Sequence, residues 1–298
     1  MSNRQTASFL IRRFAEAGLH PVTRRGQNFL IDLNLLELLA DTAQVSPTEV
    51  VFEVGTGLGS LTAILAARAA AVVSVEVDRH LQQLAAEHLV DFGNVTLLCQ
   101  DALKNKNRLH PNVWDAIRDA LERTGARQFK LVANLPYCIA TPIVSNLLAG
   151  DPLPASMTVT IQKELADRLT AQPGTKAYGA LSIWVQSQCD TQIVRIMPPS
   201  VFWPRPQVDS AIVHIVPNAQ KRERIPHREF FHAFVRGLFL HRRKMLRSCL
   251  LSASARRLTK QDVDRLLEEQ GLAAEARAEQ LDTATLLALC ESVRRHLG

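Results

Sequence analysis

Short apolar runs rich in β-branched residues alternate with helical patterns along most of this chain, and that alternation restricts its fold more than any other feature. Four runs predict buried strands, at residues 50–54, 72–75, 95–98 and 129–133. Helical patterns lie between them, at residues 58–70, 81–90 and 111–123. Strands separated by helices in this way pair as a parallel sheet that is covered by helices on both faces.

The rest of the chain divides into two parts with different patterns. Three later apolar runs are expected to complete the sheet, at residues 157–161, 192–197 and 211–216. Residues 29–42 have apolar side chains at helical spacing and predict a helix packed against the first strand. After Pro217 only helices are predicted, at residues 228–240, 242–251, 259–269 (with Thr259 as the N-cap) and 283–296. We therefore predict a Rossmann-like α/β domain over residues 1–217 and a smaller all-helical domain over residues 218–298.

The first predicted strand runs into a loop with glycines at alternate positions, Gly55, Gly57 and Gly59. Glycine lets the backbone turn sharply and approach a ligand that a Cβ atom would block. Dinucleotide-binding loops have the spacing G-x-G-x-x-G, but Ser60 stands where their third glycine would be. The observed spacing is typical of loops that wrap the amino-acid part of S-adenosylmethionine, and a purely structural turn is the alternative.

Acidic residues follow the next two predicted strands. Glu76 comes about 20 residues after Gly55, where a carboxylate can accept hydrogen bonds from both ribose hydroxyls of a nucleoside. Asp101 follows the third strand and is placed to accept from the adenine amino group. Either residue alone is more often a helix cap or part of a solvated turn. After a glycine loop and at one edge of a sheet, the two predict a nucleoside site.

The segment Asn134-Leu135-Pro136-Tyr137 follows the fourth predicted strand and carries the most specific chemical signal. An aromatic amine is a poor nucleophile because its lone pair is delocalised into the ring. The Asn134 side-chain oxygen and a backbone carbonyl next to Pro136 can each accept one hydrogen bond from such an amine. This geometry favours a pyramidal nitrogen whose lone pair points at the methyl group of a sulfonium donor. We therefore predict methyl transfer by positioning, without a metal ion.

Two aromatic side chains are candidates for holding the target base. Tyr137 offers a ring face beside Asn134, and Phe202 lies in a segment stiffened by Pro204 and Pro206. A base in a duplex or loop must be extruded to reach such a site, and stacking on an aromatic ring contributes roughly 1–3 kcal/mol. The alternative for both rings is a role in the core.

The charge of the chain is concentrated in one segment. The net charge is +6, yet residues 219–257 alone hold eleven Lys and Arg against two Glu. A basic block on an otherwise slightly acidic protein predicts a polyanionic partner such as RNA, and a solvated helix face is the alternative.

Several features exclude other classes of protein. The five cysteines form no C-x-x-C pair, so neither a zinc site nor a disulfide framework is indicated. No apolar run reaches about 18 residues, so no membrane-spanning segment is predicted. The N-terminal region lacks a secretory core, and an ordinary basic arm is favoured over a mitochondrial presequence. We expect a cytoplasmic monomer without a metal ion.

These motifs resemble those of the KsgA family of ribosomal RNA adenine dimethyltransferases, which are Rossmann-like class I methyltransferases with a helical RNA-binding domain. The resemblance covers almost the whole chain, from residues 26–32 to residues 277–281. It implies cofactor contacts by Asn28, Leu30, Gly55, Gly57, Gly59, Glu76, Asp101 and Asn134. It implies that the target base is held by Asn134, Pro136, Tyr137 and Phe202. The RNA contacts expected are Arg24, Arg25, Lys163, Arg168, Lys176, Arg205, Arg222, Arg224, Arg242, Arg243, Lys244 and Arg247.

The reaction that the resemblance implies is N6,N6-dimethylation of two adjacent adenosines near the 3′ end of small-subunit rRNA during subunit maturation. S-adenosylmethionine would be the methyl donor. The chain departs from the family pattern at Thr56, where proline is usual, and at Cys138 and Ala140, where Asn and Ser are frequent. The segment of residues 105–128 is longer than the corresponding segment usual in the family, and an extra helix is expected there.

Two rival functions remain open on the sequence. Erm-type methyltransferases modify large-subunit rRNA with the same chemistry, but they more often have Ile where Leu135 stands. A non-catalytic RNA-binding assembly factor or transcription factor on the same fold is the second rival. Such a protein would be expected to lose Asn134, Glu76 or the glycine loop, and all of these are present.

Overall fold

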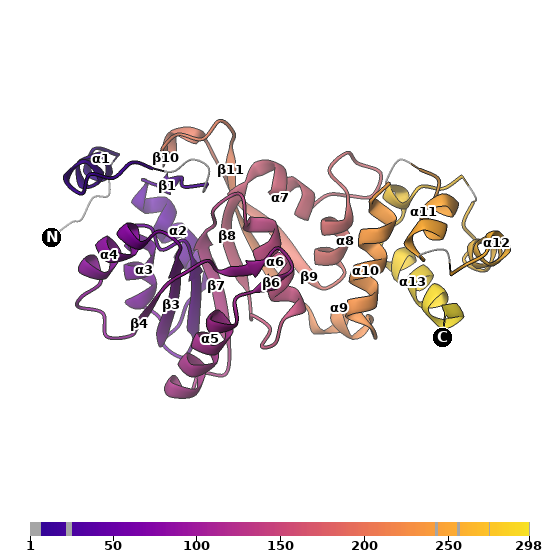
Figure 1. Ribbon diagram of the computed structural model, residues 1–298, viewed down its shortest axis with the longest axis horizontal. Helices are drawn as coiled ribbons and strands as arrows, with labels where there is room; N and C mark the ends of the chain where they lie inside the picture. The colour runs from indigo at the N-terminus through magenta and orange to yellow at the C-terminus, as the bar shows by residue number, and fades with distance from the viewer. Residues whose placement is uncertain (1–6, 22–25, 242–243, 255–256, 274, 298) are drawn as a thin grey trace. The chain divides into compact units, whose positions relative to one another are not determined.

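The architecture is described from a computed structural model, which describes residues 7–21, 26–241, 244–254, 257–273 and 275–297. Its main sheet has seven strands in the order β4-β3-β2-β7-β8-β11-β9 (Figure 1). Their bounds are β2 Val50–Val54, β3 Ala71–Glu76, β4 Val95–Cys99, β7 Phe129–Asn134, β8 Met157–Gln162, β9 Cys189–Met197 and β11 Ser210–Pro217. All seven predicted strands are therefore present, and the predicted α/β class is confirmed.

The sheet is parallel only in part. Parallel pairs join β4 to β3, β3 to β2, β2 to β7 and β7 to β8. β11 runs antiparallel to β8, with Ser210 opposite Gln162 and Ile215 opposite Met157. The four strands that alternate with helices are thus parallel, as predicted, and β11, for which no direction was predicted, is antiparallel. A strand buried on both faces is continuously apolar, and that pattern contains no information about strand direction.

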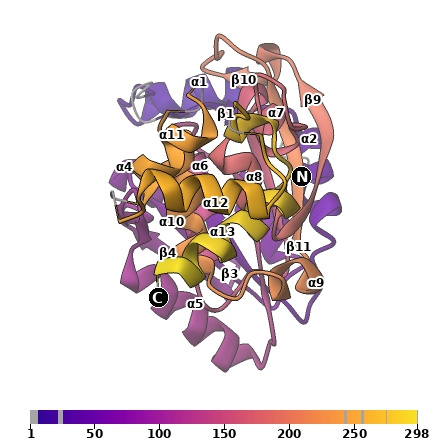
Figure 2. The same ribbon diagram turned by 90° about the vertical axis from the view of Figure 1, so that its right-hand side faces the viewer.

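Helices cover the two faces of the sheet (Figures 1 and 2). On one face, α2 (Leu33–Ala43) and α3 (Ser60–Ala66) share a core cluster with Val51, Val72 and Val132. Side chains alternate along a strand, so Phe129 points to the other face, where Trp114 of α5 (Pro111–Thr124) contacts it edge to face. The further helices of this part of the chain are α4 (Arg79–His88) and α6 (Ala140–Ala149). The helix expected within residues 105–128 is α5, which follows a small hairpin of β5 (Leu103–Asn105) and β6 (Arg108–Leu109).

The helix predicted over residues 29–42 begins later than expected. Phe29–Leu30 forms a short strand, β1, which pairs antiparallel with β10 (Phe202–Trp203). Asp32 is the N-cap of α2, and its carboxylate accepts a hydrogen bond from Asn34 N at 2.9 Å. Asp competes for backbone donors and so favours the first position outside a helix, which explains the later start.

An N-terminal helix, α1 (Ala7–Glu16), was not predicted. Its buried Leu10 and Phe14 pack on Leu58 and Leu81, next to the glycine loop. The Phe14 ring lies edge to face on Trp203, with ring centroids 5.0 Å apart. Helix α1 therefore covers the outside of the glycine loop.

The chain forms two compact units, residues 1–166 with 192–216 and residues 167–191 with 217–298. The second unit contains part of α7 (Lys163–Leu169), and also α8 (Ala180–Gln186), α9 (Ala219–Glu223), α10 (Arg228–Phe239), α11 (Leu246–Ala253), α12 (Lys260–Glu269) and α13 (Thr283–Leu297). Residues 167–191 group with the later helices because Tyr178 is buried and its hydroxyl donates to Leu281 O at 2.9 Å. The division of function at residue 217 stays a prediction.

The four helices predicted after Pro217 are found, with small differences at their ends. Thr259 is the N-cap of α12, as predicted, and it accepts a hydrogen bond from Asp262 N at 3.1 Å. The helix expected from residue 242 begins at Leu246, with Met245 as its N-cap, since Lys244 and Met245 are not helical. Residues 242 and 243 lie outside the described part of the chain. Among the described helices, none has the length and apolar character needed to cross a membrane.

Candidate active site

Two glycines bring the predicted site motifs together. Gly55 has φ +89°, and a Cβ atom there would lie 3.3 Å from Cδ of Pro136. Gly26 has φ +68°, and a Cβ atom there would lie 3.0 Å from the backbone nitrogen of Tyr137. Positive φ and this close approach together favour glycine at both positions. The glycine loop and the 26–32 segment therefore both lie against the Asn134–Tyr137 motif.

Glu76 closes the glycine loop onto the end of β3. It is 6% exposed, and its two carboxylate oxygens accept hydrogen bonds from Gly57 N and Asp78 N, each at 3.0 Å. Burial raises the pKa of Glu76, while these backbone donors oppose the rise. Each carboxylate oxygen has a second lone pair, so Glu76 can still accept hydrogen bonds from a ligand.

A cavity of about 280 Å³ opens beside Glu76 at the carboxyl ends of the strands. The residues that line it include Gly55, Glu76, Asp101, Pro136 and Cys138. Asp101 accepts a hydrogen bond from Leu103 N at 2.8 Å, which fixes its carboxylate after β4. The glycine loop and both predicted carboxylates thus meet in one pocket, at the edge where open α/β sheets bind nucleosides.

Asn134 lies at the end of β7 with its amide held in one orientation. Its Nδ2 donates to the backbone oxygen of Asn28 at 2.9 Å, whereas its buried Oδ1 has no hydrogen-bond partner. Buried polar atoms are rarely left without a partner, so this acceptor indicates a ligand donor. The Pro136 carbonyl accepts from Ile139 N at 3.1 Å and has a second lone pair available.

The two aromatic candidates differ in accessibility. Tyr137 is half-buried, and its hydroxyl is hydrogen-bonded to Ser210 Oγ at 2.6 Å, which fixes the ring direction. Phe202 is 3% exposed and packs in the core cluster with Leu30, Met197 and Ile212. The ring of Phe202 is therefore part of the core in this structure, and its role in base stacking stays a prediction.

A buried carboxyl group that the sequence reasoning missed lies beneath the glycine loop. Glu53 is 1% exposed, and its Oε2 accepts hydrogen bonds from Thr62 Oγ1 and Ser74 Oγ, both at 2.6 Å. Thr56 Oγ1 lies 2.6 Å from Ser74 Oγ. Burial raises the pKa of Glu53 to about 8, and the nearby Glu76 adds to the rise. The position of this acidic residue, two residues before the first glycine of the loop, is the sequence feature from which Glu53 could have been predicted as a site residue.

The raised pKa of Glu53 predicts that the difference in stability between the unmodified protein and Glu53→Gln depends on pH. A group whose pKa is higher in the folded protein contributes stability that is present at low pH and is lost as the pH rises from about 4.5 to about 8. Glu53→Gln, which stays neutral, should therefore gain Tm relative to the unmodified protein as the pH increases from about 5 to about 9. Thermal unfolding of both proteins at the two pH values measures this. Exposed Glu268→Gln is the control, and an equal Tm difference at both pH values would contradict the raised pKa.

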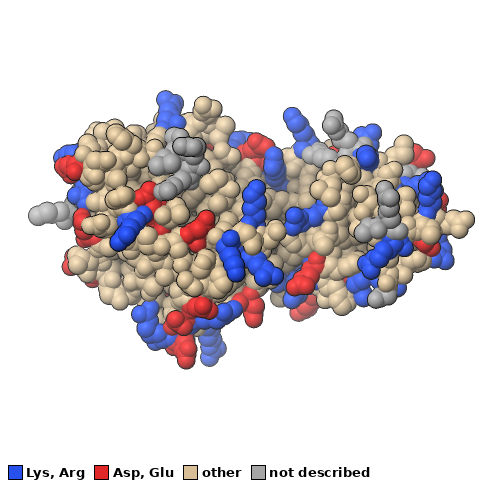
Figure 3. Space-filling view, in the orientation of Figure 1, with Lys and Arg blue, Asp and Glu red and all other residues tan. Residues whose placement is uncertain are grey.

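The predicted RNA-contacting residues have different surroundings. Exposed side chains are those of Arg168, Lys176, Arg205, Arg224 and Lys244, and Lys163 is half-exposed. The Arg247 guanidinium bonds both carboxylate oxygens of Asp264, and Arg222 donates to Gln188 Oε1 at 2.6 Å. Lys and Arg side chains gather over the helices of the second unit on the face drawn in Figure 3. Arg24, Arg25, Arg242 and Arg243 lie outside the described residues.

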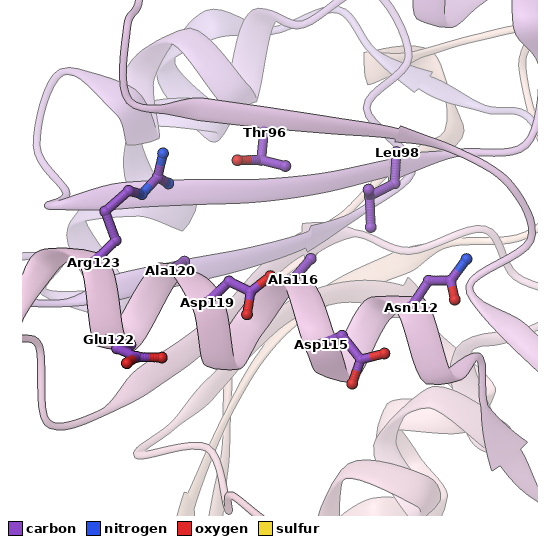
Figure 4. A pocket seen from close by; sticks show the side chains of 9 residues that line it. All are labelled: Thr96, Leu98, Asn112, Asp115, Ala116, Asp119, Ala120, Glu122 and Arg123. Carbon is purple, nitrogen blue, oxygen red and sulfur yellow. The ribbon is translucent and has the colours of Figure 1, made fainter.

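A larger hollow of about 690 Å³ lies elsewhere, between the edge strand β4 and helix α5 (Figure 4). Thr96 and Leu98 line it from β4, and Asp119 and Arg123 are among the side chains that line it from α5. None of the predicted site residues lines this hollow. It has an open, mixed-charge surface without the convergent acceptors of the smaller pocket, so its volume does not mark the candidate site.

By its fold and its site, the protein is a class I methyltransferase. The features that define this class are the sheet order, the glycine loop after β2 and the carboxylates at the ends of β3 and β4. The sequence family of ribosomal RNA adenine dimethylases matches residues 22–293. The chain belongs to this family. The enzyme class that the resemblance implied, an rRNA adenine dimethyltransferase, is thereby confirmed.

Individual relatives are similar in sequence to this chain over most of their length. Ribosomal RNA small subunit methyltransferase A of Pediococcus pentosaceus is 40% identical over 273 residues, or 91% of this chain and 89% of that protein. The protein of the same name from Geobacillus sp. (strain WCH70) is 37% identical over 274 residues, or 91% of each chain.

Two solved structures are similar over almost the whole chain. A dimethyladenosine transferase from Plasmodium falciparum has a TM-score of 0.70 and 23% identity, covering 87% of this chain and 94% of that one. The 23S rRNA methyltransferase ErmE has a TM-score of 0.61 and 25% identity, covering 89% and 99%. The first likeness concerns the fold alone.

Proposed function

We propose that this enzyme transfers methyl groups from S-adenosylmethionine to N6 of two adjacent adenosines near the 3′ end of small-subunit rRNA, during subunit maturation. The observation that carries the proposal is the buried, unpartnered Oδ1 of Asn134, two residues before Pro136, which lines the pocket of about 280 Å³. The small-subunit target is supported by the names of relatives that are 37–40% identical.

The described residues fit this cofactor. Glu76 would accept hydrogen bonds from the ribose hydroxyls and Asp101 from the adenine amino group, because both carboxylates line the 280 Å³ pocket. Asn28, Leu30 and the three loop glycines would surround the amino-acid part. The bound cofactor supplies an activated methyl group on a sulfonium, so the protein needs no metal ion or covalent intermediate.

The chain's own residues act by positioning the target amine. Asn134 Oδ1 and a backbone carbonyl next to Pro136 would each accept one N–H hydrogen bond, which directs the nitrogen lone pair away from the ring. Because Nδ2 of Asn134 is held by Asn28 O, the acceptor is oriented before the base arrives. Tyr137 would stack on the extruded base. Holding the amine nitrogen and the methyl group in a fixed geometry would account for much of the increase in the rate of methyl transfer.

The two rivals are less well supported. ErmE shares the fold, but relatives that are 37–40% identical to this chain are named for the small subunit. A non-catalytic factor has no need for an oriented acceptor at Asn134 or for a loop closed by Glu76. We further propose that residues 218–298 bind RNA and that the enzyme acts as a cytoplasmic monomer.

The target is tested by methylation with labelled S-adenosylmethionine. The protein is incubated separately with immature small subunits and with large subunits, each lacking the modification. We expect label in N6,N6-dimethyladenosine of the small-subunit rRNA only. Label confined to large-subunit rRNA would support the Erm-type alternative, and no label in either would refute catalysis.

The proposed role of the basic block is tested at an exposed lysine. Lys244→Glu should weaken binding to small-subunit rRNA roughly tenfold at low salt, and the difference should shrink as salt is raised to about 0.2 M, because phosphate contacts are screened. Lys260→Glu on α12 makes the same charge change at an exposed position outside the predicted set. Equal RNA affinities for the two variants at all salt concentrations would exclude Lys244 from the interface.

A further inference from the structure

The hollow between β4 and α5 has a floor of strand side chains and a wall of helix side chains (Figure 4). Val95 packs on the core cluster of the opposite face of the sheet, so the alternation of side chains turns Thr96 and Leu98 toward the hollow. Helix α5 packs over β3 and β2 and runs alongside β4, and the space of about 690 Å³ lies between that helix and β4. The hollow is therefore an open groove along the edge of the sheet.

The outer edge of β4 offers unpaired backbone groups. Strand β4 lies at one end of the sheet, and among the described strands only β3 pairs with it. Just before β4, Asn94 O accepts a hydrogen bond from Val72 N at 2.9 Å. Just after β4, Gln100 N donates to Glu76 O at 3.0 Å. Even-numbered residues therefore face β3, and the odd-numbered residues of β4 direct their backbone N–H and C=O groups to the free edge.

The sequence of β4 lacks the usual protection of a free edge. Proteins commonly block such an edge with a charged side chain, a proline or a bulge. Strand β4 contains no charged residue and no proline, and its pairing with β3 is regular. Its residues are partly buried except for the exposed Cys99. An unprotected and mostly apolar edge is a template for a further strand, so a covering segment is expected there.

The charges along the groove restrict what that segment can be. The lining contains three carboxylates, on Asp115, Asp119 and Glu122, against the one guanidinium of Arg123, although the whole chain has a net charge of +6. Asp115 is paired with Arg118 at 3.6 Å, whereas Asp119 and Glu122 are exposed and form no ion pair within the described part of the chain. This surface repels RNA, and pairing of two β4 edges would bring two acidic walls together. A cationic protein segment is the complementary occupant.

The wall of the groove is held in place from behind. The ring of Trp114 lies edge to face on Phe129, with ring centroids 6.4 Å apart, and it fills the space over Gly150, where a Cβ atom would clash with it. Arg118 donates to Asp151 O at 2.9 Å. Because α5 is fixed to the loop after α6 in this way, the groove is formed before a partner arrives, and little ordering is needed on binding.

We propose that the groove between β4 and α5 binds an extended segment of a partner protein that is rich in Lys or Arg, and that this segment adds as a strand to the free edge of β4. Alternate residues of a strand lie about 6.6 Å apart, close to the helical pitch of roughly 5.4 Å. Basic side chains at alternate positions therefore match carboxylates on successive turns of α5. The inference is independent of the proposed function, because the groove and the cofactor pocket share no lining residue.

Binding is measured with a fluorescein-labelled peptide of alternating Lys and Val, about eight residues long, by fluorescence anisotropy with the full-length protein. A peptide of alternating Glu and Val is the control, with the same apolar content and the opposite charge. We expect the Lys peptide to bind roughly tenfold or more tightly than the Glu peptide at about 50 mM salt, with a smaller difference near 0.2 M. Equal binding of the two peptides, or no binding of the Lys peptide, would overturn the inference.

Amide hydrogen exchange tests whether a strand is added. Saturation with the Lys peptide should slow exchange at Val95, Leu97 and Cys99, whose amides point to the free edge. A Lys peptide methylated at every second backbone nitrogen cannot complete the ladder and should bind roughly tenfold more weakly. Unchanged exchange at β4 in the presence of bound peptide would refute strand addition. Protection of these amides by self-association of the protein, or by an RNA oligonucleotide, would also refute the proposal and assign the groove to a second copy or to RNA.

Charge reversal on α5 separates this groove from the rest of the surface. The double variant Asp119→Lys with Glu122→Lys changes exposed positions outside the cofactor pocket, so it should fold and bind S-adenosylhomocysteine as the unmodified protein does. We expect it to bind the Lys peptide roughly tenfold more weakly. Glu268→Lys with Glu269→Lys makes the same charge change at exposed positions of α12 and should leave peptide affinity nearly unchanged. An equal loss in the two double variants would mean that the peptide responds to net charge alone, and would contradict the groove as its site.

Discussion

Asn134→Ala should lower kcat for adenosine methylation by roughly 10²–10³-fold, the range found when one oriented hydrogen-bonding group is removed from a reacting centre. The variant removes the buried Oδ1 acceptor, so the amine of the target base keeps its lone pair in the ring. It also removes the Nδ2 bond to Asn28 O, although the backbone of β7 stays paired with β8. Single-turnover methylation of small-subunit rRNA with saturating cofactor measures the effect.

Two controls accompany this prediction. Dissociation constants for S-adenosylhomocysteine and for RNA should change much less than kcat, because the lost interaction concerns the target nitrogen. Asn134→Asp keeps acceptor oxygens but cannot donate to Asn28 O, so it separates amine binding from orientation of the side chain. Methylation by Asn134→Ala at the rate of the unmodified enzyme would exclude the proposed role.

Glu76→Ala should weaken binding of S-adenosylhomocysteine by about 10²-fold, because the hydrogen bonds from both ribose hydroxyls are lost together. The same change leaves the Gly57 N–H without its partner and loosens the glycine loop. Glu76→Gln keeps one acceptor oxygen and should lose less affinity. Calorimetric titration gives both constants, and thermal unfolding checks that each variant is folded.

A matched control for Glu76→Ala is the same substitution at a glutamate outside the pocket. Glu87 on α4 is exposed, and Glu87→Ala removes a carboxylate outside the pocket. We expect its cofactor affinity to match that of the unmodified protein. If Glu76→Ala bound the cofactor as tightly as Glu87→Ala does, the ribose would have to be held elsewhere.

Much of this arrangement follows from local sequence patterns. The runs that became β2, β3, β4 and β7 are short, rich in β-branched residues and bounded by turn residues, a combination that favours strands over helices. The strand β4, predicted to be buried, is only partly buried at the edge of the sheet. Glycines at positions 55, 57 and 59 and acids at the ends of the next two strands then converge, because parallel strands present their carboxyl ends at one edge. The fold class and the position of the pocket could therefore be predicted.

Other features depend on contacts between distant residues, which no local pattern contains. The pairing of β1 with β10 joins Leu30 to Phe202, far apart in the sequence, and it replaces the first residues of the helix predicted over residues 29–42. The position of Glu53 two residues before Gly55 is visible in the sequence, but its contacts with Thr62 and Ser74 depend on how α3 and β3 pack. The antiparallel direction of β11 and the grouping of residues 167–191 with the later helices are of the same kind.

The most direct test of the account is an experimental structure of the full-length protein with S-adenosylhomocysteine bound. The account predicts ribose hydroxyls on Glu76, adenine beside Asp101, and the sulfur directed toward Asn134, so that a methyl group on it would lie about 3–3.5 Å from an amine bound at Oδ1. A ligand bound away from the glycine loop, or an Asn134 Oδ1 turned into the core, would contradict it.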